Sequence, residues 1–183
     1  PNDDGHELVA SVIIHVLEQI RVSAGMEVKS DSGEAEKVPL TANAYEDSIR
    51  YQNDSAVFTA NGFVADQDRQ DGITDIFKNG WTANQKGATI TFEVEGSCIG
   101  IQYRKTIKLP APVAEVVIDD DSTHAVRLDA NFDETWGDKL QLDTIAEHIE
   151  KEKHKVQITI TETHETDQLP FYLVSVIASG KEK

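Results

Sequence analysis

Four side chains in the second half of the sequence are of the types that bind sugars. Trp136 and Phe132 lie in an acidic segment, 131–138, whose composition favours a loop, and Tyr103 stands directly before Arg104. Carbohydrate-binding sites set aromatic rings against the apolar faces of sugars and use polar side chains for the hydroxyl groups. We therefore predict that Trp136 is exposed and that the carbohydrate-binding residues are Trp136, Phe132, Tyr103 and Arg104.

The other tryptophan and the single cysteine have contexts that favour burial. Trp81 follows Asn79-Gly80 and precedes an apolar segment, so we predict that it is a core residue. Cys98 stands at the start of an alternating segment with no charge beside it to activate a thiol. Because it is the only cysteine, the chain can form neither an internal disulfide nor a zinc site of several cysteines.

The sequence contains neither the motifs of a serine hydrolase site nor a convincing set of metal ligands. A serine hydrolase needs a nucleophile, a base and an orienting acid, and neither Gly-x-Ser-x-Gly nor Gly-Asp-Ser occurs. Lysines interleave with the possible ligands of Glu147–Lys155, which favours a solvated loop, and Asp119-Asp120-Asp121 favours an acidic turn over a Ca²⁺ site. We expect no catalytic residue, no metal site and no cofactor.

The charge of the chain excludes some classes of partner. Seventeen basic residues against thirty-three acidic ones leave a net charge of −16 on 183 residues. Clustered Lys and Arg are needed to bind nucleic acids or anionic membranes, so we expect neither as a partner. The first residue is Pro1 rather than Met, from which we expect the chain to be a piece of a longer protein.

One amphipathic helix is predicted over residues 3–22. An N-cap aspartate precedes a broad apolar face, and Ser23-Ala24-Gly25 favours a helix end. The face is too wide to leave in water. The helix therefore packs on the following domain, pairs with a second copy or contacts a part of the protein outside this sequence. The face consists of Leu8, Val9, Val12, Ile13, Val16, Leu17 and Ile20.

The rest of the chain changes from helical to strand periodicity. A hydrophilic linker is predicted over 23–40, followed by short alternating segments separated by turn residues. Such a pattern is typical of an antiparallel β-sandwich, and eight to ten strands favour a jelly roll. The strong strands are 89–95, 98–103, 113–118, 125–128, 154–161 and 171–178, with weaker candidates at 48–52, 56–60, 75–78 and 139–142; 143–150 favours a helical turn or a loop.

The start of the helix resembles the last conserved block of the SGNH (GDSL-type) hydrolases, Asp-x-x-His-Pro-Asn-x-x-Gly-His followed by an apolar helix. The matching residues are Pro1, Asn2, Gly5 and His6. The resemblance implies that the family's catalytic His precedes Pro1 and that its Ser, Asp and oxyanion-hole residues lie further upstream. His6 matches a histidine that the family does not use as its base, so the four residues are a structural remnant of the block.

Several later sequence segments resemble those of the accessory jelly-roll domain of bacterial carbohydrate esterases. They are Asn79-Gly80-Trp81, residues 90–96, Val116-Val117-Ile118-Asp119 and residues 154–158, in that order. The resemblance implies the terminal helix of an SGNH domain over 1–22 and a non-catalytic, glycan-binding or bracing sandwich over 41–183. Its partners would be a polysaccharide or oligosaccharide and the missing SGNH catalytic domain, in a protein that removes acyl groups, plausibly acetyl, in an extracellular bacterial setting. A homodimer through the helix, a purely structural or protein-interaction sandwich, and a free-standing carbohydrate-binding module are the alternatives.

Overall fold

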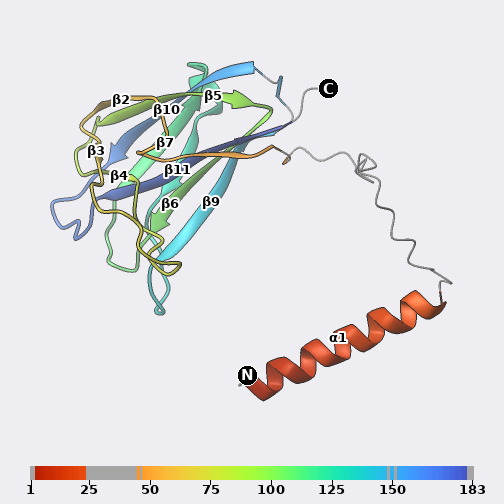
Figure 1. Ribbon diagram of the computed structural model, residues 1–183. Helices are drawn as coiled ribbons and strands as arrows, with labels where there is room; N and C mark the ends of the chain where they lie inside the picture. Colours follow the sequence, from red (N-terminus) through yellow and green to blue (C-terminus); the bar gives the residue numbers. More distant parts are fainter. Residues whose placement is uncertain (1–2, 24–44, 46, 148, 151, 181–183) are drawn as a thin grey trace. The chain divides into compact units, whose positions relative to one another are not determined.

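The computed structural model describes residues 3–23, 45, 47–147, 149–150 and 152–180 (Figure 1). The chain divides into two compact units, Pro1–Leu40 and Thr41–Lys183. The predicted linker lies outside the described residues from residue 24 onward.

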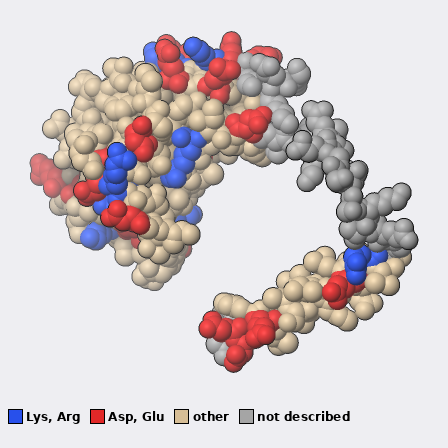
Figure 2. Space-filling view, in the orientation of Figure 1, with Lys and Arg blue, Asp and Glu red and all other residues tan. Residues whose placement is uncertain are grey.

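The first unit contains the helix α1, Asp3–Ser23. Asp3 and Asp4 lie in its first turn and Arg21 in its last, the arrangement that the helix dipole favours. None of its residues is buried, and its large apolar side chains are 50–72% exposed. Figure 2 shows acidic atoms at one end of the helix and uncharged side chains along most of its length. No helix of the described part of the chain is long and apolar enough to cross a membrane.

The second unit is an antiparallel β-sandwich, as the sequence predicts. One sheet has the strand order β3-β4-β11-β6-β9, with β1 also paired to β11, and the other has the order β2-β5-β10-β7-β8 (Figure 1). The strands are β1 Ile49–Tyr51, β2 Phe58–Asn61, β3 Val64–Ala65, β4 Trp81–Ala83, β5 Thr89–Gly96, β6 Cys98–Lys105, β7 Val113–Ile118, β8 Val126–Asp129, β9 Lys139–Ala146, β10 Glu152–Glu162 and β11 Phe171–Ser179.

Alternating apolar residues fill the space between the two sheets. In β5, Ile90, Phe92 and Val94 are buried while Glu93 and Glu95 are exposed, the pattern of a strand with one face in a core. The central strand β11 has nearly all its residues buried because its outer face is covered as well. Trp81, Phe92 and Phe171 are the largest fully buried side chains.

Three secondary-structure predictions are wrong. Residues 75–78 form no strand, whereas the short strands β3 and β4 were not predicted. Residues 143–146, predicted as a helical turn or a loop, continue β9 because the long strand β6 pairs with them, Gly100 with Thr144 and Ile101 with Asp143. The third concerns the end of Glu147–Lys155, predicted as a solvated loop. There β10 begins at Glu152, two residues before the predicted strand 154–161, and His154 is buried.

Candidate functional site

Two aromatic side chains lie together in the loop between β8 and β9. The indole of Trp136 is 66% exposed, as predicted, and the ring of Phe132 is half-buried beneath it. Their ring centroids are 5.1 Å apart at an interplanar angle of 87°, an edge-to-face contact. The Lys139 ammonium lies 5.6 Å from the centroid of the Phe132 ring. The loop therefore presents an exposed indole that is in edge-to-face contact with a second ring.

A buried threonine on the neighbouring connection between β6 and β7 holds this loop. Thr106 is 2% exposed, and its hydroxyl donates to Asp138 Oδ1 at 2.7 Å while it accepts from the Lys108 N–H at 3.2 Å. The backbone N–H of Thr106 donates to the Ala130 carbonyl, and the Phe132 N–H donates to the Thr106 carbonyl. One residue thus contacts both ends of the loop that carries Trp136.

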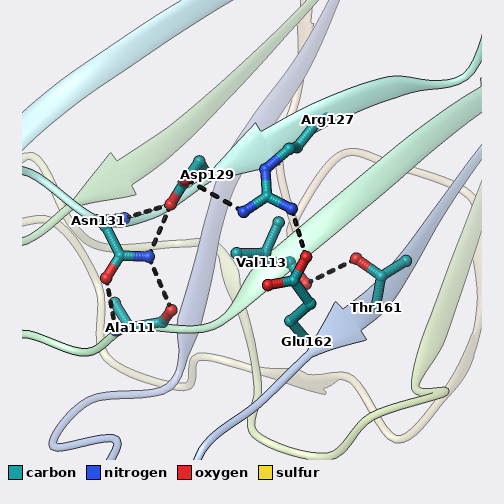
Figure 3. Close-up of polar contacts among 7 residues, drawn as sticks. All are labelled: Ala111, Val113, Arg127, Asp129, Asn131, Thr161 and Glu162. Carbon is teal, nitrogen blue, oxygen red and sulfur yellow. Dashed lines mark hydrogen bonds and ion pairs between the residues drawn. The ribbon is translucent and has the colours of Figure 1, made fainter.

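The start of the loop has a second anchor, drawn in Figure 3. The side-chain amide of Asn131 accepts from the Ala111 N–H at 2.9 Å and donates to the Ala111 carbonyl at 3.0 Å. Asp129 Oδ1 accepts from both the backbone and side-chain N–H groups of Asn131, at 2.9 and 2.7 Å. Burial alone would raise the pKa of Asp129, but these hydrogen bonds and Arg127 outweigh it and lower the pKa.

The remaining contacts of Figure 3 link β8 to β10 and β10 to β7. Arg127 pairs with Asp129 on its own strand and with Glu162 at the end of β10. The Thr161 hydroxyl donates to the Val113 carbonyl at 3.4 Å. These contacts fix the strand from which the aromatic loop departs.

Arg104, predicted as a sugar ligand, contacts several neighbouring loops. Its guanidinium lies 5.4 Å from the ring centroid of Tyr172 and 5.8 Å from that of Phe77, and it donates to the Pro170 carbonyl at 3.0 Å. Its Nε is 3.9 Å from Asp138 Oδ2. Burial lowers the pKa of Arg104, more than Asp138 raises it. The group is therefore occupied by contacts within the sandwich.

Tyr103, the fourth predicted residue, is a core residue. It is 2% exposed, and its ring stacks on Phe171 with centroids 5.7 Å apart. Its hydroxyl donates to Asp143 Oδ2 at 2.8 Å, and burial, followed by this carboxylate, raises the pKa of the phenol. Successive side chains of a strand point to opposite faces, so Tyr103 and Arg104 on β6 cannot serve one surface site. The prediction that Tyr103 offers a ring to a sugar is therefore wrong.

His154 hydrogen-bonds through both ring nitrogens, to Asp119 and to the Glu150 carbonyl, and the sequence did not predict this arrangement, which we call the His154 clamp. The imidazole is 4% exposed, with Nδ1 2.7 Å from Asp119 Oδ2 and Nε2 2.9 Å from the Glu150 carbonyl. Burial lowers the pKa of His154, but the hydrogen bonds with Asp119 and Glu150 outweigh it and raise the pKa. Burial alone would raise the pKa of Asp119, but the hydrogen bonds with His154 and the Lys155 N–H outweigh it, so the pKa is lowered. Among the described residues, no group of three or more His, Cys, Asp or Glu side chains is placed to hold a metal ion.

The residues of the helix-start block are only partly described. Pro1 and Asn2 lie outside the described residues, whereas Gly5 and His6 lie in the first turns of α1, where His6 is exposed. Trp81 has the position predicted for it, fully buried against Phe58 and Phe92.

Solved structures show what the chain is related to. No protein-family model matches the chain, and a search of curated proteins found no match. A two-domain esterase active on acetylated mannans, crystallised with mannopentaose, is 56% identical to this chain, with a TM-score of 0.85. A second structure of a two-domain esterase active on acetylated mannans is 57% identical, with the same TM-score. Over its whole length the chain is therefore similar to about half of a two-domain esterase.

The structural match extends over the whole of this chain but over only part of each two-domain esterase. The match covers 100% of this chain and 48% of each two-domain esterase, so the chain spans about half of their length. Two more distant carbohydrate esterases show the same fold. A family two carbohydrate esterase from Cellvibrio japonicus has 13% identity and a TM-score of 0.51, covering 73% of this chain and 34% of that one. An acetyl xylan esterase from the rumen bacterium Butyrivibrio proteoclasticus has 13% identity and a TM-score of 0.50, covering 73% and 32%.

Proposed function

We propose that this chain is the non-catalytic accessory part of a carbohydrate esterase, and that its sandwich binds a polysaccharide through the loop that carries Trp136. The observation that carries the proposal is an indole left 66% exposed although the segment around it is tightly hydrogen-bonded. The ring of Phe132 makes an edge-to-face contact with that indole. The relatives that act on acetylated mannans make a mannan the first glycan to test.

Electrophoresis in gels that contain acetylated mannan tests this function. The 183-residue chain should be retarded relative to a gel without polysaccharide, and Trp136→Ala should migrate as in the empty gel. Trp81→Phe serves as the matched control, because it alters the other tryptophan, which is buried. Equal retardation of Trp136→Ala and the unaltered chain would contradict the proposal.

The helix and the domain boundaries belong to the same proposal. Residues 1–22 would be the last helix of an SGNH catalytic domain, 23–40 the linker and 41–183 the accessory domain. The exposed apolar face of α1 supports this, since most of a helix's stability in proteins comes from packing of its amphipathic face. The partner would be the catalytic domain, and the complete protein would hydrolyse acyl esters, acetyl among them, on a glycan.

A charge on the apolar face tests what covers the helix. In the complete esterase, Val12→Asp should lower the unfolding temperature of the catalytic domain and leave the transition of the sandwich unchanged in calorimetry. Val12 lies on the apolar face, and His15→Asp, outside that face, is the matched control. Sedimentation of the 183-residue chain as a dimer that Val12→Asp dissociates would favour a second copy as the partner instead.

A further inference from the structure

In the loop between β8 and β9, Gly137 directly follows Trp136. Gly137 has φ +137°, a conformation that residues with a side chain rarely adopt, and no other atom lies within 4 Å of the position of an added Cβ. Asp138, the next residue, bonds to the Thr106 hydroxyl. The chain thus turns between an exposed indole and a side chain that is fixed to the sandwich.

The two sides of this loop are held unequally. Its first residues are held by the hydrogen bonds between Asn131 and Ala111 (Figure 3). Two backbone hydrogen bonds to Thr106 hold them as well. On the other side, before β9 begins, the side chain of Asp138 has the hydrogen bond from Thr106 and the longer contact with Arg104 at 3.9 Å. The Thr106 hydroxyl is therefore the closest polar contact of the segment that immediately follows Trp136.

From this geometry we infer that Thr106, through Asp138, is a positioning residue that holds Trp136 ready for a glycan before the glycan arrives. The inference rests on the proposed function. Fixing the backbone of one residue costs about 1–2 kcal/mol in conformational entropy, so a loop that is already ordered binds without that cost. Thr106 is suited to this role because it is buried and its hydroxyl has both a donor and an acceptor partner.

A pair of substitutions at Thr106 separates the hydroxyl from the shape of the side chain. Thr106→Val keeps the shape and removes the bond to Asp138, whereas Thr106→Ser keeps the hydroxyl. Titration of the 183-residue chain with mannopentaose should show binding weakened about tenfold for Thr106→Val, equivalent to about 1.4 kcal/mol. Thr106→Ser should bind within about twofold of the unaltered chain because its hydrogen bond remains.

The mobility of the two indoles distinguishes positioning from simple stabilisation. In ¹⁵N relaxation measurements, the Trp136 indole N–H of Thr106→Val should become mobile on the picosecond-to-nanosecond scale. The Trp81 indole should remain rigid in every variant, since it is buried in the core. If Thr106 only stabilised the sandwich, its substitution would lower the free energy of unfolding without changing the mobility of the Trp136 indole N–H.

A second variant guards against misfolding of the first. Asp138→Ala removes the same hydrogen bond from its more exposed end, where the side chain is 26% exposed, and leaves the Lys108 contact of Thr106 in place. It should weaken mannopentaose binding and mobilise Trp136 as Thr106→Val does. Unchanged affinity or a rigid Trp136 indole in both variants, together with lost binding in Trp136→Ala, would overturn the inference alone. Unchanged binding in Trp136→Ala would instead overturn the proposed function.

Discussion

The two tryptophans of this chain have opposite surroundings. Trp81 is fully buried, with its ring edge-to-face against Phe58 at 5.2 Å and Phe92 at 5.1 Å, and within the described residues its Nε1 has no hydrogen-bond partner. Trp136 has one aromatic neighbour, Phe132 at 5.1 Å, and leaves most of its surface in water. The same residue type therefore packs in the core at position 81 and is exposed to solvent at position 136.

The difference lies in what each backbone does. Trp81 begins the strand β4, which pairs with β11 and so directs its side chain between the sheets. Trp136 lies in a loop that side-chain hydrogen bonds, rather than strand pairing, hold to the sandwich. The proposed function gives the exposed indole on this anchored loop a ligand, whereas the buried indole of Trp81 has a role in folding alone.

The largest effect on stability is expected from Trp81→Ala. Removing a large buried aromatic side chain costs about 3–5 kcal/mol because it leaves a cavity. Chemical unfolding of the variant should show this loss, or no folded state at all. A loss below about 1 kcal/mol would contradict the assignment of Trp81 to the core.

A smaller loss of stability is expected from Arg104→Met. The substitution keeps much of the apolar stem but removes the bond to Pro170 and the contacts with Tyr172 and Phe77. Because hydrogen bonds of charged groups contribute about 1.5–3 kcal/mol, the free energy of unfolding should fall by about 2 kcal/mol. Unchanged stability, with mannan binding lost, would restore Arg104 as a direct sugar ligand.

The His154 clamp predicts a dependence of stability on pH. The pKa of His154 is raised in the folded state, so its contribution is complete below about pH 6.5 and is lost as the pH rises through the folded pKa. The pKa of Asp119 is lowered, so its contribution is present above about pH 3.9 and is lost as the pH falls through its folded pKa. The pair should therefore stabilise most between the two titrations.

Comparison with His154→Leu isolates this contribution from other titrating groups. The difference in the free energy of unfolding between the unaltered chain and the variant should be largest near pH 6 and narrow as the pH rises toward 9. A difference that stays constant over this range would show that His154 acts by packing rather than by charge.

The sequence was most informative where one pattern determined the structure. Alternation in 89–95 and 113–118 predicted β5 and β7 because each strand has one face in the core. The short strand β4 escaped because three residues carry too little periodicity, and the extension of β9 escaped because pairing with β6 decides it. Pairing Tyr103 with Arg104 was an avoidable error, since strand geometry separates consecutive side chains.

Parts of the site depend on contacts between distant residues and could not be predicted. Thr106 and Asp138 are 32 positions apart, and no local pattern marks them as partners. The partners His154 and Asp119 are 35 positions apart. The predicted strand 154–161 includes His154, but no local pattern indicates that Asp119 is its partner. The exposure of Trp136 could be predicted because the acidic residues around it favour a loop.

The comparison of the two tryptophans is tested most directly by measuring stability and mannopentaose affinity on the same Trp136→Ala sample. The free energy of unfolding should change by less than about 1 kcal/mol, since an exposed ring loses only its contact with Phe132. Affinity for mannopentaose should fall at least tenfold, equivalent to about 1.4 kcal/mol. Intact stability with lost affinity is the predicted result. Unchanged affinity at intact stability would contradict the account.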